Sequence, residues 1–144
     1  MERAKRLVFD TNVYIAAIRG GLFCPAFRIL QEKLPRTHLA SVVSAELLAG
    51  AITPAARRVV LDFIRLAHGV HRVVVPSADS WERAGVLLGE IRQKEPSLRS
   101  KLPTLWNDLL IALSARQIGA TVVTGDMRDF ELIRRYLRFN LHIL

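Results

Sequence analysis

Short runs of consecutive apolar residues recur along the chain and predict buried strands. The first run, Leu7-Val8-Phe9, ends at Asp10 and contains no polar position, as expected for a strand covered on both faces. The later runs are rich in β-branched residues, which are common in strands. The pattern predicts five strands, at residues 7–9, 37–43, 72–75, 121–123 and 141–144.

Apolar residues spaced three or four positions apart fill the intervals between these runs and predict helices. Thr53-Pro54 is typical of a helix start, since a capping residue is followed by proline in the first turn, and Ser44 is a second expected N-cap. The polar, basic stretch 95–103 holds two prolines and is expected to be a loop. The predicted helices cover residues 11–18, 25–34, 45–51, 54–67, 77–94, 104–118 and 128–137.

The alternation of strands and helices predicts an α/β domain, in which a parallel sheet has helices on both faces. Two helices carry an apolar stripe that is expected to face the core. In residues 54–67 the stripe is Val59, Phe63 and Leu66. In residues 77–94 it is Trp81, Ala84, Leu88 and Ile91. Because the chain shows no linker or internal repeat, we expect residues 1–144 to form a single domain.

The charge balance indicates what kind of partner the chain would bind. The chain has a formal net charge of +8, and most of its 21 basic residues are arginine, which contacts phosphate in a bidentate manner. This composition favours a nucleic-acid partner, although an arginine-rich solvated surface would look the same. A single cysteine excludes an internal disulfide. The segment before Asp10 is too short for a signal peptide and no apolar run reaches the length of a membrane span, so we expect a cytoplasmic protein with no membrane partner.

Acidic side chains follow the predicted strands at the points where each strand ends. Asp10 follows the first strand directly, Glu46 lies in the predicted first turn after the second, and Asp126 and Asp129 follow the fourth. The carboxyl ends of parallel strands share one edge of a sheet, which is where such sheets bind ligands. Each acid has an alternative explanation, because Asp10, Glu46 and Asp129 would also stabilise the starts of the helices that follow.

Asp108 reaches the same edge from inside a predicted helix, where aspartate is unfavourable. Ala112 and Ala115 lie on the same helical face, and their small size would allow that helix to approach the sheet closely. Carboxylates gathered in one pocket repel one another unless a cation neutralises them. Mg²⁺ and Mn²⁺ prefer oxygen ligands, whereas the histidines and the lone cysteine form no zinc-like cluster. A carboxylate-held metal beside a basic surface favours phosphodiester hydrolysis.

Four motifs in this order resemble the PIN-domain family, and most closely its VapC-type toxins. They are Phe9-Asp10-Thr11-Asn12-Val13, Glu46-Leu47-Leu48-Ala49-Gly50, Asn107-Asp108-Leu109-Leu110-Ile111-Ala112 and Thr124-Gly125-Asp126-Met127-Arg128-Asp129-Phe130. The likeness runs from about residue 7 to the C-terminus. It implies a three-layer α/β/α sandwich around a central, mainly parallel sheet of four to five strands.

The resemblance also implies a site and partners. Its acids correspond to Asp10, Glu46, Asp108 and Asp126 as catalytic metal ligands, with Asp129 as a further metal ligand. Thr11, Asn12 and Thr124 correspond to supporting positions, Asn12 as a brace for the pocket. The implied activity is Mg²⁺- or Mn²⁺-dependent endoribonuclease cleavage of RNA. The implied partners are a cognate antitoxin protein and a second copy of the chain in a homodimer.

Two other functions stay open at this point. A non-catalytic RNA-binding or regulatory PIN domain would keep the fold without cleavage. An aspartyl phosphatase would also carry a nucleophilic aspartate after a strand, but that class has a second aspartate two residues later, where this chain has Asn12. The basic residues Arg92, Lys94, Arg99 and Lys101 surround the start of the Asp108 helix, where they would either steer RNA or form an ordinary solvated face.

Overall fold

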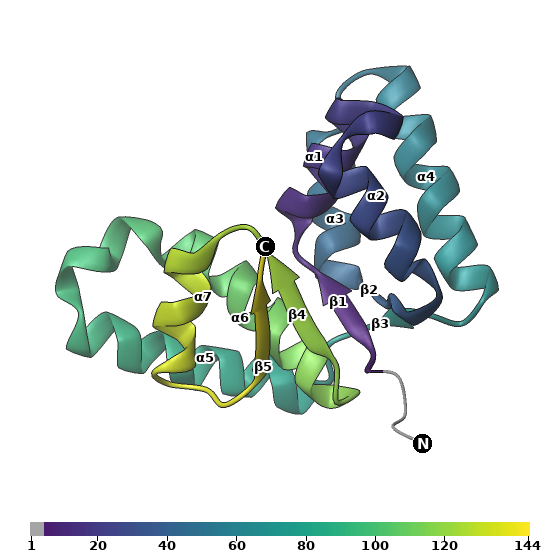
Figure 1. Cartoon of the computed structure of the whole chain (residues 1–144). Coiled ribbons are helices and arrows are strands. Elements are labelled where there is room, and N and C mark those ends of the chain that lie inside the picture. The colour runs from purple at the N-terminus through teal and green to yellow at the C-terminus, as the bar shows by residue number, and fades with distance from the viewer. Residues whose placement is uncertain (1–4) are drawn as a thin grey trace.

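The computed structural model describes residues 5–144, and its strands are paired in parallel. β1 (Leu7–Phe9), β4 (Thr121–Thr124) and β5 (Asn140–Ile143) form one sheet in the order β1-β4-β5, and β2 (Leu39–Ala40) pairs with β3 (Val73–Val74). A parallel bridge between Leu7 and Thr37 joins the two sets, and the His38 N–H donates to the Leu7 carbonyl at 2.8 Å. The order across the molecule is therefore β3-β2-β1-β4-β5 (Figure 1).

Seven α-helices lie in the described residues. They are α1 (Thr11–Gly20), α2 (Pro25–Lys33), α3 (Ser41–Gly50), α4 (Pro54–Gly69), α5 (Ala78–Lys94), α6 (Leu102–Gln117) and α7 (Met127–Arg134). Three 3₁₀ segments accompany them, at Gly21–Phe23, Leu34–Arg36 and Pro96–Lys101. In residues 5–144 no single helix has the length and apolarity of a membrane span; only Thr11–Phe23 and Pro25–Arg36 taken together, bent by 103°, meet that test.

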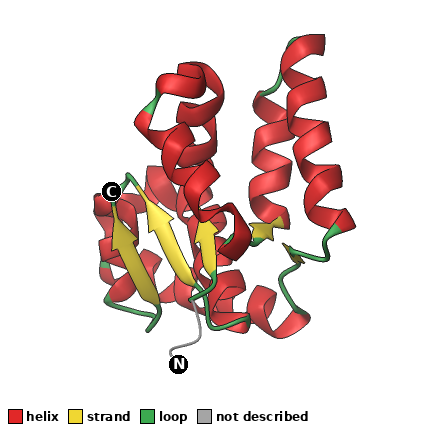
Figure 2. Ribbon diagram, turned by 45° about the vertical axis from the view of Figure 1, so that its right-hand side comes forward, coloured by secondary structure: helices red, strands yellow, loops and turns green. Residues whose placement is uncertain are grey.

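The predicted α/β class is confirmed, with helices flanking parallel strands. Figure 1 shows α1 to α4 as one group beside β1, and α5 to α7 as a second group beside β4 and β5. In Figure 2 the three longer strand arrows point the same way, so their carboxyl ends share one edge. The strands form a three-stranded and a two-stranded segment joined by one bridge, whereas the sequence predicted one uniform sheet.

The core is centred on α6, which packs against β1 and β4. This helix is buried along most of its length, from Leu105 through Ala115, because other elements surround it: β1 and β4, together with α3, α5 and α7. Ala112 and Ala115 are fully buried, as expected if small residues allow close approach. The helix therefore carries Asp108 into the interior at the strand ends.

The predicted boundaries after the second strand are wrong. The strand is confined to Leu39–Ala40, and α3 begins at Ser41 with Ala40 at the N-cap. Ser44 is not an N-cap, since its hydroxyl donates to the Ala40 carbonyl from inside the helix at 3.5 Å. The β-branched Val42 and Val43 suggested a longer strand, but tertiary packing places them in a helix. Glu46 consequently lies in the second turn of α3 and not in the first.

The stretch 95–103 is helical, not the loop that its polarity suggested. Residues Pro96–Lys101 form a 3₁₀ segment, and α6 begins at Leu102. Both prolines stand within the first two positions of their helices, where the missing N–H has no intrahelical partner to lose. This compact segment fixes Lys101 against the start of α6.

Two predicted apolar stripes are only partly buried. In α4 the buried positions are Val60, Ile64 and Ala67, while Val59 and Leu66 are 53% and 55% exposed. In α5 the predicted core residue Trp81 is 46% exposed, and its ring centroid lies 6.2 Å from that of Trp106. Both helices carry apolar residues on adjacent faces, so periodicity alone does not select the buried face.

Candidate functional site

Asp10 is held at the end of β1 by three hydrogen bonds. Its backbone N–H donates to the Val123 carbonyl at 2.9 Å, which continues the pairing of β1 with β4. Its Oδ1 accepts the Thr11 N–H at 2.7 Å as the N-cap of α1, and its Oδ2 accepts the Thr124 hydroxyl at 2.9 Å. The side chain is buried, so both oxygens are fixed in direction.

Glu46 is drawn to the same place by Thr11. The Thr11 hydroxyl donates to Glu46 Oε1 at 2.9 Å, which ties α3 to the beginning of α1. Thr11 therefore serves Asp10 through its backbone and Glu46 through its side chain. Thr11 and Thr124, two of the predicted supporting residues, both hydrogen-bond to predicted acids.

Asp108 lies among the other four acids. It is 8% exposed. Burial is the largest cause raising the pKa of Asp108 to about 8, and the negative charges of Asp10, Asp129, Glu46 and Asp126 raise it further, in that order. Because the charges of all four acids act on Asp108, the five predicted acids lie in one region of the structure. The raised pKa therefore favours the protonated form of Asp108 in the metal-free protein.

The pKa of Asp10 is also raised, although two hydrogen bonds lower it in part. Burial raises it most, and the hydrogen bonds from Thr124 and Thr11 act in the other direction because they favour the charged form. The charges of Glu46 and Asp126 then add to the rise. The acids form a partly buried, low-dielectric cluster, and a nearby cation would lower the free energy of their charged forms.

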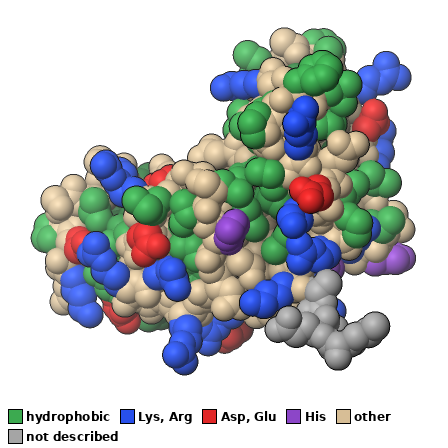
Figure 3. Space-filling view, viewed as in Figure 1, with side chains coloured by type: hydrophobic (Ala, Val, Ile, Leu, Met, Phe, Trp, Pro, Cys, Tyr) green, Lys and Arg blue, Asp and Glu red, His purple; other side chains and the backbone are tan. Residues whose placement is uncertain are grey.

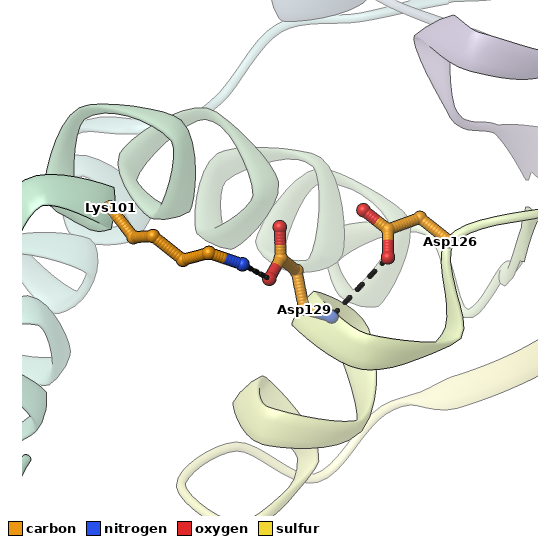
Figure 4. Close-up of polar contacts among 3 residues, drawn as sticks. All are labelled: Lys101, Asp126 and Asp129. Carbon is orange, nitrogen blue, oxygen red and sulfur yellow. Dashed lines mark hydrogen bonds and ion pairs between the residues drawn. The ribbon is translucent and has the colours of Figure 1, made fainter. Parts of the chain in front are cut away.

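Asp126 and Asp129 complete the cluster from the start of α7 (Figure 4). The Thr124 hydroxyl accepts the Asp126 N–H at 2.9 Å, and Asp126 Oδ1 caps α7 by accepting the Asp129 N–H at 3.5 Å. Asp129 is buried, and its Oδ1 lies 3.1 Å from Lys101 Nζ, which reaches in from the 3₁₀ segment before α6. Lys101 was predicted only as one of several basic residues; its contact with Asp129 depends on tertiary packing, which sequence spacing does not reveal.

Asn12 lies outside this network. Its side chain is exposed on α1, and within residues 5–144 it makes no side-chain hydrogen bond to the acids. The described residues therefore show no hydrogen bond by which Asn12 braces the acids. The neighbouring Thr11, by contrast, donates its hydroxyl to Glu46.

The donor set suits a hard divalent cation. Five carboxylates and two hydroxyls supply only oxygen, and Mg²⁺ needs one or two direct carboxylates with water completing its shell. Within residues 5–144, no three Asp, Glu, His or Cys side chains stand close enough to ligate one ion together.

Replacing Lys101 by alanine is expected to destabilise the metal-free protein. Asp129 would lose its one cationic contact while staying buried beside Asp108. Because Lys101 is partly exposed, we expect a modest cost of about 1 kcal/mol, or roughly 2–4 °C in melting temperature. Thermal denaturation in EDTA measures it, with Arg99→Ala in the same 3₁₀ segment as the matched control. Equal melting temperatures for the two variants would contradict this account of the ion pair.

Comparisons with known proteins identify the family and the fold of this chain. A family model described as "PIN domain" matches residues 7–136. A chain of VapBC2 from Rickettsia felis, solved with a DNA fragment from the promoter, is 23% identical, with a TM-score of 0.65 over 96% of this chain and 98% of that one. A chain of DNA-bound VapBC from Salmonella typhimurium is 22% identical, with a TM-score of 0.66 and coverage of 97% and 98%.

A third similar structure is VapBC-5 from Mycobacterium tuberculosis, a member of the VapBC family of toxin–antitoxin systems. It is 21% identical, with a TM-score of 0.59 and coverage of 98% of this chain and all of that one. No curated protein sequence matches this chain. At these identities the three structures establish a shared fold over nearly the full length of both chains.

Proposed function

This chain belongs to the PIN-domain family, and we propose that it is a Mg²⁺- or Mn²⁺-dependent endoribonuclease that acts as the toxin of a toxin–antitoxin pair. The observation that carries the nuclease proposal is Asp108, a buried acid affected by four other carboxylates at the carboxyl edge of the sheet. Such a concentration of negative charge opposes folding, so its presence in the folded protein points to a functional site. The fold shared with VapBC structures supports the toxin part.

Asp10, Glu46, Asp108 and Asp126 are the residues proposed to hold the metal, with Asp129 as an additional ligand. When bound, the ion supplies charge neutralisation at the scissile phosphate and lowers the pKa of water. The chain's own contribution is positioning. Thr124 and Thr11 fix both oxygens of Asp10, and Thr11 also orients Glu46. Because burial raises the pKa of Asp108, a cation must compete with a proton for this carboxylate.

The decisive experiment is cleavage of RNA by the purified protein. We expect Mg²⁺ or Mn²⁺ to support internal cleavage of an RNA of several hundred nucleotides, and EDTA to stop it. Binding without cleavage in either metal would instead support the non-catalytic alternative. Release of inorganic phosphate from a small phosphomonoester would favour the phosphatase reading. Growth arrest on expression, relieved in a cleavage-deficient variant, tests the toxin role separately.

We propose that the antitoxin docks in an apolar groove between α1, α2 and α4. The groove encloses about 420 Å³ and is lined almost entirely by apolar side chains, including Tyr14, Phe27, Leu30, Val59 and Phe63. The Tyr14 hydroxyl is buried without a hydrogen-bond partner among residues 5–144. Large exposed apolar residues at the mouth of the groove, among them Leu22 and Val59, fit an apolar partner segment.

Placing a charge in this groove is expected to weaken the complex without unfolding the protein. Val59→Asp puts a carboxylate at the apolar interface, and Val59 is exposed in the free chain. We expect affinity for the product of the adjacent antitoxin gene to fall at least tenfold, measured by calorimetry. The matched control is Val86→Asp, at an exposed position on α5. Unchanged affinity with Val59→Asp would place the antitoxin elsewhere.

Two further proposals carry over from the sequence, the homodimer as what the family resemblance implies and the cytoplasmic location as what the sequence pattern led us to expect. We propose that the protein forms a homodimer and acts in the cytoplasm. Light scattering on the purified protein tests the first of these proposals, and a monomer at micromolar concentration would contradict it. Fractionation of cells that express the tagged chain tests the second.

A further inference from the structure

A basic groove lies on one face of the β1-β4-β5 sheet, apart from the acid cluster. It encloses about 570 Å³, and its floor includes Leu7, Phe9, Thr121 and Val123. These are alternate positions of β1 and β4, so they share one face of the sheet. By the same alternation, the side chains of Asp10 and Thr124 turn to the other face, where they meet in a hydrogen bond.

The charge around this groove has one sign. Its rim carries Lys5, Lys33, Arg36, Arg134 and His142, and no acidic residue in the described part of the chain lines it. Figure 3, viewed as in Figure 1, shows basic side chains on this face of the molecule, with apolar and some acidic side chains between them. Cations along a concave apolar surface attract a polyanion and concentrate it there.

We infer that this groove, the basic groove, binds a single-stranded segment of the RNA substrate outside the catalytic centre. The inference rests on the proposed RNA-cleaving function and names where the substrate is held. The basic side chains on the rim can contact phosphates, and Asn140 and His142 on the edge strand can offer hydrogen bonds to base edges and 2′-hydroxyls.

The basic groove meets the acid cluster at one end. Leu144, a lining residue, donates its N–H to the carbonyl of Thr124 at 2.9 Å. The side chain of that same Thr124 contacts Asp10. An RNA strand bound in the groove would therefore reach the acids by passing over the carboxyl edge of the sheet. This path predicts that groove contacts affect RNA binding more than the rate of cleavage at saturation.

The test is the affinity of a fluorescein-labelled 20-nucleotide oligouridine for the full chain, measured by fluorescence anisotropy in EDTA. The groove variant is Lys33→Gln with Arg36→Gln. The matched control is Arg57→Gln with Arg58→Gln, two exposed arginines on α4 outside the groove. Losing two phosphate contacts is expected to weaken binding at 0.1 M salt roughly tenfold or more and to lower the salt slope by about 1.4. The control variant should bind as the wild type does.

The outcomes separate this inference from the proposed function. Wild-type affinity in the groove variant, or an equal loss in the control, overturns the basic groove as the binding site. Tighter binding of polyglutamate than of oligouridine, lost in the groove variant, overturns RNA as the occupant in favour of an acidic protein segment. RNA binding that depends on the groove, without cleavage in Mg²⁺ or Mn²⁺, would contradict the nuclease proposal and support the groove as the RNA-binding site.

Discussion

Replacing Asp10 by asparagine is expected to reduce metal-dependent RNA cleavage by about a thousandfold or more. Asp10 is the acid whose two oxygens are both fixed, by Thr11 and by Thr124. Asparagine keeps the shape but removes the negative charge that would attract the cation. It also turns an NH₂ group toward one of two hydrogen-bond donors, so a smaller loss of stability accompanies the loss of activity. Initial rates of cleavage with Mn²⁺, together with the melting temperature, measure both effects.

The matched control for this variant is Asp62→Asn. Asp62 is an exposed residue of α4 that forms a surface ion pair with Arg65 at 3.8 Å. Its replacement removes the same charge far from the strand ends and should leave cleavage unchanged. Cleavage by the Asp10 variant at more than a tenth of the wild-type rate would remove Asp10 from the proposed metal ligands.

The stability of the metal-free protein is expected to fall as the pH rises from about 4 to about 8. Unfolded aspartate has a pKa near 3.9, whereas the pKa of Asp108 in the folded chain is about 8. Over this range the folded state holds a proton on Asp108 that the unfolded state has released. The free energy of unfolding therefore loses about 1.4 kcal/mol per pH unit from this group. Urea denaturation in EDTA at several pH values measures the slope.

Asp108→Asn supplies the control for this pH dependence. Asparagine cannot ionise, so the variant should lose most of the slope and be more stable than the wild type at pH 8. Saturating Mn²⁺ should also flatten the slope in the wild type, because the ion stabilises the charged form of the site. An identical slope in the wild type and Asp108→Asn would contradict the assignment of the raised pKa to this residue.

The acids were predictable because their positions follow from strand ends. Asp10 directly follows a continuous apolar run, and Asp126 follows another run by two residues, so the topology of a parallel sheet brings them to one edge. Asp108 was predictable for a different reason: aspartate is unfavourable inside a helix unless something requires it there. These arguments need only local sequence and the direction of the strands.

Features that depend on tertiary packing could not be predicted from the sequence. Val42 and Val43 favour a strand locally, yet they lie in α3. Apolar residues on two sides of α4 left the buried face undecided, and the chosen stripe included the exposed Val59. The contact of Lys101 with Asp129 arises because a proline-containing segment forms a 3₁₀ turn against α6. Each of these outcomes was decided by contacts between distant parts of the chain.

The hydroxyl of Thr124 has only one hydrogen, and that hydrogen points at Asp10. The other oxygen of Asp10 faces an amide N–H, so an added proton on this carboxyl would crowd against a hydrogen already in place. Asp108, by contrast, has no such donor aimed at it among residues 5–144. A proton held by the metal-free acid cluster is therefore expected on Asp108 of α6 and not on Asp10 of β1, and a bound cation would compete with it there.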